Sequence, residues 1–165
     1  MVYMQGENDG FAHSTTKEYT QSMKLMYKNM DKKTDIEACL LIRIGTYIPK
    51  PSLYNKVLKA QTQLCKTDEN FVLISAKAAS FSAGYYQEDG LHLTQKGLNV
   101  LGKDAGKYAA KYANTGIEPS MKDPKYKNTY KPDPPKKKEA PETETETPDV
   151  PSGSSATENG SVAFE

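Results

Sequence analysis

The run IEACLLIRI, at residues 36–44, decides the fold class of this chain. It has the length of a strand and is apolar almost throughout, which is typical of a strand in a parallel sheet that is covered on both faces. FVLIS at residues 71–75 is a second such run, and MVYM at residues 1–4 is a shorter one. We therefore expect three strands of one sheet. Arg43 lies near the end of the first run and could face a site there, although a surface salt bridge is the simpler role.

Helical patterns lie between these runs. Thr15 and Glu18 have capping-box spacing, which predicts a helix over residues 15–31. Its expected buried stripe is Tyr19, Met23, Met26 and Met30. A second helix should follow Pro49 and Pro51, with Ser52 as its cap. Its expected buried stripe is Leu53, Val57, Ala60, Leu64 and Cys65.

A last helix should begin at Thr94, after the third strand. One face carries Leu98, Leu101, Ala105, Tyr108 and Tyr112. Another side carries Gly97, Gly102 and Gly106, where a neighbouring backbone could come close. Strands that alternate with helices in this way predict an α/β fold with a parallel sheet and right-handed crossovers. The two cysteines, Cys39 and Cys65, lack metal-ligand or redox spacing, and we expect them to be buried free thiols.

Two polar clusters stand where such folds carry their chemistry, after the carboxyl ends of strands. Residues 5–10 (QGENDG) follow the first strand, and residues 89–94 (DGLHLT) lead into the last helix. Asp89 lies three residues before His92, so its carboxylate can accept the ring Nδ1–H and leave Nε2 free as a base. That is two thirds of a nucleophilic triad. Taken alone, such a pair also arises by chance, and Asn8 and Asp9 before Gly10 could simply build a turn.

The order of these clusters resembles that of the SGNH (GDSL-like) hydrolase superfamily, whose motifs include Gly-x-Asn-Asp and Asp-x-x-His. Gly6-Glu7-Asn8-Asp9 and Asp89-Gly90-Leu91-His92 match them. Gln5-Gly6-Glu7 resembles the Gln-Gly-Glu of sialate O-acetylesterases and acetylxylan esterases, which remove acetyl groups from sugars. The resemblance covers residues 1–114. It implies a three-layer α/β/α flavodoxin-like fold, an acetylated glycan as substrate, and neither a metal nor an organic cofactor.

The resemblance also implies roles for single residues. His92 would be the general base and Asp89 would hold its tautomer. Asn8 would donate its amide to the oxyanion, a contribution of about 3 to 4 kcal/mol in such enzymes. Glu7 would be a second carboxylate acting on the histidine. Gln5, with Gly6 beside it, is a weaker candidate for contact with substrate or oxyanion. His13 has no patterned partner and is expected on the surface.

One departure from the family pattern matters for activity. The family takes its nucleophilic serine and an oxyanion glycine from two earlier motifs, and no serine of this chain lies in such a context. Without a hydroxyl to activate, a histidine base forms no acyl-enzyme. We therefore expect an N-terminally truncated domain, with an exposed apolar strand edge, marginal stability and poor activity on its own.

Other readings remain open. A non-catalytic carbohydrate-binding or adhesion module could keep the fold without the nucleophile. A GDSL-type lipase or thioesterase is a further possibility, which Gln-Gly-Glu argues against. A doubly wound domain of unrelated function is also possible, because fold does not fix function.

Composition bounds the partners and the location. The net charge of +1 gives no electrostatic case for nucleic acid. There is no apolar run long enough to enter a membrane and no signal-peptide pattern, which alone favours the cytoplasm. Residues 115–165 are expected to be a disordered linker or stalk. Within them, EAPETETETPDVPSGSSATENG (residues 139–160) is typical of spacers in extracellular bacterial proteins. An extracellular or cell-surface parent chain with further domains reconciles both observations.

Overall fold

The computed structural model describes residues 1–133 and contains a central sheet of three parallel strands. These are β1 (Val2–Tyr3), β2 (Cys39–Ile42) and β3 (Phe71–Ser75), in the spatial order β1-β2-β3. Leu40 of β2 is level with Val2 on one side and with Val72 on the other. The expected parallel sheet is confirmed. Because the strands are parallel, their carboxyl ends share one edge of the sheet.

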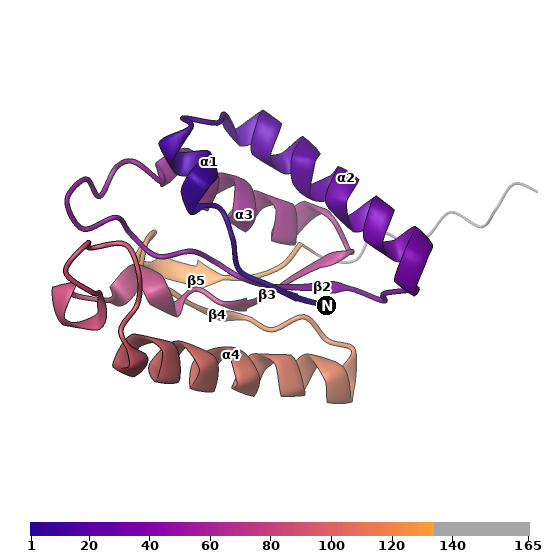
Figure 1. The fold of residues 1–165 in the computed structure, drawn as a ribbon. Coiled ribbons are helices and arrows are strands. Elements are labelled where there is room, and N and C mark those ends of the chain that lie inside the picture. Colours follow the sequence, from indigo (N-terminus) through magenta and orange to yellow (C-terminus); the bar gives the residue numbers. More distant parts are fainter. Residues whose placement is uncertain (134–165) are drawn as a thin grey trace, which may run out of the picture. The chain divides into compact units, whose positions relative to one another are not determined.

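Helices cover both faces of this sheet (Figure 1). On one face lie α1 (Glu7–Phe11), α2 (Thr16–Thr34) and α3 (Asn55–Thr67), and on the other lies α4 (Gln95–Thr115). The first layer packs Tyr19 and Leu64 against Leu41 and Leu73, while Ala105 of α4 packs against the opposite side. The α/β/α arrangement expected from the sequence is therefore confirmed.

Two of the three predicted helix starts are confirmed. Thr15 and Glu18 form the complete capping box of α2, and the Thr94 side chain accepts from the N–H of Gly97 at the start of α4. The expected cap at Ser52 is wrong, because α3 begins two residues later than expected, after Tyr54, and no side chain caps it. The loop before it is already turned by backbone hydrogen bonds, including one from the N–H of Asn55 to the Ser52 carbonyl.

Two expected core positions are exposed. In α2 the buried stripe continues through Tyr27, which packs against Phe71 at the start of β3, whereas Met30 is exposed. In α4, Leu98 is exposed at the rim of a hollow. Of the three α4 glycines only Gly97 meets another backbone, with the Tyr85 carbonyl oxygen 2.6 Å from where a Cβ would stand.

The ordered region extends past the expected boundary at residue 114. A hairpin of β4 (Met121–Asp123) and β5 (Asn128–Tyr130) follows α4, and the Tyr130 hydroxyl donates to the Cys65 carbonyl of α3 at 2.7 Å. The linker expectation is thus wrong for residues 115–133. This stretch has few aliphatic residues, but Met121 and Tyr130 are buried. The rest of the expected stalk, residues 134–165, lies outside the described residues.

The expected salt bridge of Arg43 is present, but the expected surface position is wrong because the side chain is buried. Its guanidinium makes two hydrogen bonds of 2.6 Å to the carboxylate of Asp123 in β4, and the two side chains are 0% and 1% exposed. A third bond reaches the Thr62 hydroxyl at 2.9 Å. This ion pair therefore ties the hairpin to the end of β2.

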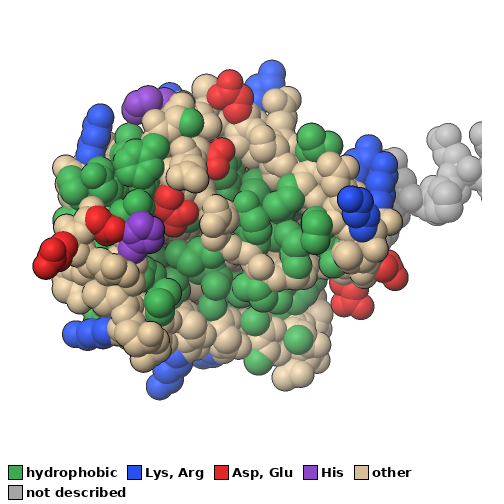
Figure 2. Space-filling model, viewed as in Figure 1, with side chains coloured by type: hydrophobic (Ala, Val, Ile, Leu, Met, Phe, Trp, Pro, Cys, Tyr) green, Lys and Arg blue, Asp and Glu red, His purple; other side chains and the backbone are tan. Residues whose placement is uncertain are grey.

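The other side of β1 has no strand partner within residues 1–133, and Val2 is largely exposed. Figure 2 shows hydrophobic side chains gathered over the middle of the face of the molecule that is seen in this view. The exposed apolar edge expected from the sequence is present. Cys39 and Cys65 are buried free thiols, also as expected. None of the helices described here combines the length and apolar character that a membrane crossing requires.

Candidate active site

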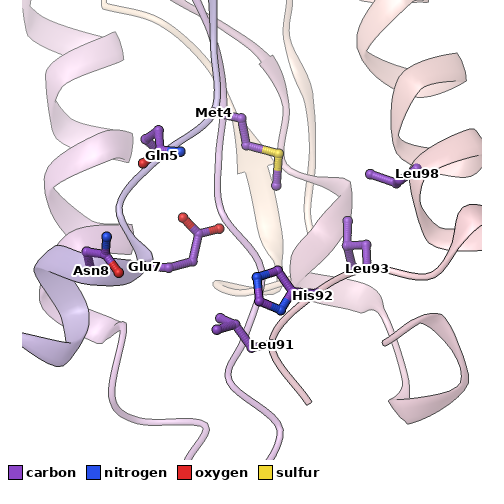
Figure 3. A pocket seen from close by; sticks show the side chains of 8 residues that line it. All are labelled: Met4, Gln5, Glu7, Asn8, Leu91, His92, Leu93 and Leu98. Carbon is purple, nitrogen blue, oxygen red and sulfur yellow. The ribbon is translucent and has the colours of Figure 1, made fainter. Parts of the chain in front are cut away.

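A hollow of about 310 Å³ brings the two polar clusters of the sequence together (Figure 3). One wall comes from the chain that leaves β1: Met4, Gln5, Glu7 and Asn8. The other comes from the loop that enters α4 and its first turn: Leu91, His92, Leu93 and Leu98. The hollow lies at the carboxyl edge of the sheet, where ligands bind in open α/β folds.

The first wall is fixed by close packing around Gly6. Its φ of +147° is unfavourable for a residue with a side chain, and an added Cβ would lie 2.7 Å from Val57 Cγ1 of α3. The Gln5 carbonyl accepts from the Tyr19 hydroxyl and from Gln61 Nε2, both at 2.8 Å. Gly6 and the backbone of Gln5 therefore set where α1 begins, and α1 carries Glu7 and Asn8.

The second wall depends on Gly90. Its φ is +64°, and a Cβ here would lie 2.8 Å from Pro49 Cδ. Its carbonyl accepts from the Ile48 N–H at 3.0 Å, which joins this loop to the loop after β2. The Gln87 N–H donates to the His92 carbonyl at 2.7 Å and closes the turn. His92 thus stands on a tight loop with little freedom.

Asp89 and His92 form the pair expected from their spacing. Asp89 Oδ2 lies 2.5 Å from His92 Nδ1, and Oδ1 accepts from the N–H groups of Leu91 and His92 at 2.8 and 2.9 Å. The bond to the His92 ring, followed by these two backbone bonds, lowers the pKa of Asp89 to about 2. The carboxylate is therefore ionised at neutral pH and favours a proton on Nδ1. The His92 side chain is 68% exposed and the Asp89 side chain 45%, so Nε2 is open to a ligand.

Glu7 faces His92 across the hollow. In Figure 3 its carboxylate points from α1 toward the space between Met4 and the imidazole. Gln5 and Asn8 line the same hollow, but Asn8 lies on the far side of Glu7 from His92 in this view. Both amide side chains are exposed. The structure therefore brings all four side chains to one cavity, with Glu7 directed toward the histidine.

No serine, threonine or cysteine lines this hollow among residues 1–133. Ser75 ends β3 at the same edge of the sheet, but it is buried and its hydroxyl donates to Asp104 Oδ2 at 2.6 Å. Among residues 1–133, the hollow thus holds an imidazole that is paired with a carboxylate, and no serine, threonine or cysteine side chain lines it. Nor does the described part of the chain place three His, Cys, Asp or Glu side chains where they could hold a metal ion.

Several residues around the hollow were not foreseen as site residues. Leu91 and Leu93 flank His92 with apolar walls, and their alternation with the histidine in LHL was a usable signal. Deeper in, Met4 and Glu7 also line a small inner space of about 20 Å³ with Tyr54 and Tyr86. The Tyr86 hydroxyl accepts from the Thr46 N–H at 3.0 Å, whereas the buried Tyr54 hydroxyl has no partner among the described residues.

Comparison with known families gives one match. A family model described as "Carbohydrate esterase, sialic acid-specific acetylesterase" matches residues 1–114, which include every residue that lines the hollow. Neither the search of curated proteins nor that of solved structures produced a match.

Proposed function

This chain belongs to the sialic acid-specific acetylesterase family of carbohydrate esterases, and we propose that it provides the base side of a serine-type site that removes O-acetyl groups from a glycan. The Asp89–His92 pair, facing Glu7 across one hollow, is the observation that carries this proposal. The acetylated sugar is of the sialate or xylan type, as the Gln5-Gly6-Glu7 sequence indicates.

In the proposed reaction the nucleophile is a serine from a segment outside these 165 residues. His92 Nε2 takes the proton of the serine hydroxyl as its oxygen attacks the acetyl carbonyl carbon. The tetrahedral intermediate then collapses, the bond to the sugar oxygen breaks, and His92 gives its proton to that oxygen. A water molecule, deprotonated by the same nitrogen, hydrolyses the acetyl-serine. Acetate leaves and the serine regains its proton.

The other side chains of the hollow assist the base and the oxyanion in this proposal. Asp89 fixes the tautomer of His92 and stabilises the imidazolium that forms. Glu7 is a second carboxylate that acts on the histidine from across the hollow. The exposed amide of Asn8 is free to donate to the oxyanion, and Gln5 contacts the substrate. Gly6, grouped with Gln5 for contact with substrate or oxyanion, also sets the position of both neighbours through its positive φ and its packing on Val57.

The experiment uses the two histidines as a matched pair. A protein extended by its natural neighbouring sequence should hydrolyse an aryl acetate, and His92→Ala should abolish the reaction. His13→Ala is the control, because His13 is also exposed but lies outside the hollow. If the extended protein folds and leaves the ester intact, or if both variants keep full activity, the esterase proposal fails.

A second candidate is a carbohydrate-binding module that has the fold of the enzyme without its nucleophile. The lack of any hydroxyl or thiol side chain on the described walls of the hollow favours it. Extension with neighbouring sequence separates the two: binding of an acetylated sugar without release of acetate, even in the extended protein, would support the module.

We also propose that the parent protein acts outside the cell or at its surface, with further domains. The Pro, Thr, Glu and Ser content of residues 139–160 supports this, since such segments act as spacers between domains. Antibodies against the parent protein should label intact cells. Labelling only after lysis would contradict the proposal.

A further inference from the structure

We propose that Phe11 and Tyr47 form a stacking platform for the pyranose ring of the substrate, next to the hollow that holds His92. This proposal rests on the proposed function and adds a binding subsite to it. The platform is built from α1 and from the loop after β2, and it does not include the residues given chemical roles above.

Phe11 is 43% exposed, although the residue before it, Gly10, is buried against the Tyr54 ring. It is the last residue of α1 and stands four residues after Glu7, so both side chains lie on the same side of this short helix. The Phe11 ring also contacts Tyr54, which lines the small space of about 20 Å³ together with Glu7 and Leu91. One side chain therefore separates Phe11 from residues of the hollow.

The ring of Phe11 is held edge-on by two tyrosines. Its centroid is 5.2 Å from that of Tyr47, with an interplanar angle of 68°, and 5.8 Å from that of Tyr54, with an angle of 84°. Both are edge-to-face arrangements, which leave part of the ring face uncovered. Gly10 permits this packing, since a Cβ on Gly10 would collide with the Tyr54 ring. The platform is therefore fixed before any ligand arrives.

The platform is joined to the loop of His92. Tyr47 is followed by Ile48, whose N–H donates to the Gly90 carbonyl, two residues before the histidine. Tyr47 and Leu91 also pack against the same core. Figure 2 shows hydrophobic side chains gathered between the two histidines of this face. A ligand lying across the Gly90 loop can thus touch the rings and His92 together.

The surroundings select the class of ligand. The hollow beyond the platform carries polar side chains at Gln5, Glu7 and Asn8, so a wholly apolar ligand that reached from the rings to His92 would leave these groups unsolvated. A pyranose ring has C–H groups on its faces and hydroxyl groups around its edge. It can stack on an aromatic face while its edge reaches polar side chains, which matches this arrangement.

The experiment is a titration of the whole 165-residue chain, followed by the NMR signals of its aromatic rings. The probes are the methyl glycoside of N-acetylneuraminic acid and methyl xylopyranoside, which represent the two sugar types. We expect either or both to shift the ring signals of Phe11 and His92 together. Phe11→Leu keeps an apolar side chain without the ring and should weaken binding about fivefold, whereas Phe11→Tyr should keep it.

The matched control is Tyr126→Leu. Tyr126 is 41% exposed and lines a different hollow, beside Thr62 and Asn128, so its loss should leave binding unchanged. If a sugar shifts His92 but Phe11→Leu binds it as tightly as the original chain, the platform is wrong while the proposed site stands. If Tyr126→Leu weakens binding equally, or if neither probe shifts Phe11, the platform is also wrong. Sugar binding at Phe11 without ester hydrolysis by the extended protein would instead overturn the proposed function.

Discussion

Two acid–base pairs of this chain, Asp89–His92 and Arg43–Asp123, are opposite in design. The first joins residues three apart in one loop, and both side chains are open to solvent. The second joins residues 80 apart in sequence and is buried completely. Burial raises the pKa of Asp123, but the hydrogen bonds and charge of Arg43 outweigh it and the net shift is downward. The buried pair holds an element in place, whereas the exposed pair leaves a ring nitrogen free.

The largest effect should come from breaking the buried pair. Asp123→Ala leaves the Arg43 charge in the interior, where its Nε already has no partner among residues 1–133. We expect a loss of about 3 to 5 kcal/mol in the free energy of unfolding, measured by urea titration. Replacing both partners, as Arg43→Met with Asp123→Leu, should recover most of it. If the single variant is as stable as the original chain, the pair does not anchor the hairpin.

The next effect concerns the loop that carries the exposed pair. Gly90→Ala places a side chain at a positive φ and against Pro49, and should cost about 1 to 3 kcal/mol. Gly102→Ala is the matched control, since its Cβ would meet nothing and α4 should gain about 0.5 to 1 kcal/mol. Thermal melting of both variants measures this. Equal melting temperatures would mean that the loop is not held as described.

A smaller effect is the pH dependence of stability, which should have opposite directions at Glu118, beside the hairpin, and at Asp89, in the loop of the exposed pair. Glu118, between α4 and the hairpin, has a buried carboxyl oxygen without a described partner, and burial raises its pKa to about 7. The free energy of unfolding should therefore fall as the pH rises from about 4.5 to about 7, because the Glu118 carboxyl loses its proton in the unfolded chain before it does so in the folded one. Asp89 has a lowered pKa, so its contribution is lost in the other direction, as the pH falls from about 4 toward 2.

Glu118→Gln should remove the first dependence, and Asp89→Asn the second. Urea titrations between pH 3 and pH 8 measure both, with each variant as the control for the other. A Glu118→Gln chain whose stability still falls between pH 4.5 and pH 7 would show that another group is responsible.

The smallest effect on stability should come from Asp89→Asn at neutral pH, because the pair is exposed. Its chemical effect should be larger, since an amide no longer fixes the proton on His92 Nδ1. The ¹⁵N shifts of the two ring nitrogens should become more alike in this variant. Unchanged ¹⁵N shifts would mean that Asp89 does not set the tautomer.

The sequence made one of these regions predictable and hid the other. Asp89 and His92 are close in the chain. Glu7 comes after the carboxyl end of β1, and Asp89 and His92 come after that of β3, so the parallel sheet brings all three to the same edge. The β4–β5 hairpin (residues 121–130, MKDPKYKNTY) lacks a strand-like apolar run. Its anchor, Arg43, was readable only as a charged residue near the end of a strand. Long-range pairs of this kind depend on packing that no local pattern records.

The local backbone geometry and the aromatic contacts could not be predicted from the sequence either. The sequence does not predict helix α1, because five residues that include a glycine are too few to show a helical period. Phe11 and Tyr47 fall in segments without periodicity, and only the packing of Gly10 on Tyr54 explains their arrangement. The long helices, by contrast, carried their caps and most of their stripes in the sequence.

Alkylation of the two buried thiols, Cys39 and Cys65, can report local unfolding of this chain. Burial raises the pKa of Cys39 to about 11 and that of Cys65 well above its usual value, so almost no reactive thiolate exists in the folded protein. Alkylation must therefore wait until β2 or α3 is exposed. Since the hairpin bonds to the Cys65 carbonyl, the order in which the two thiols gain mass records whether the hairpin side or the sheet opens first.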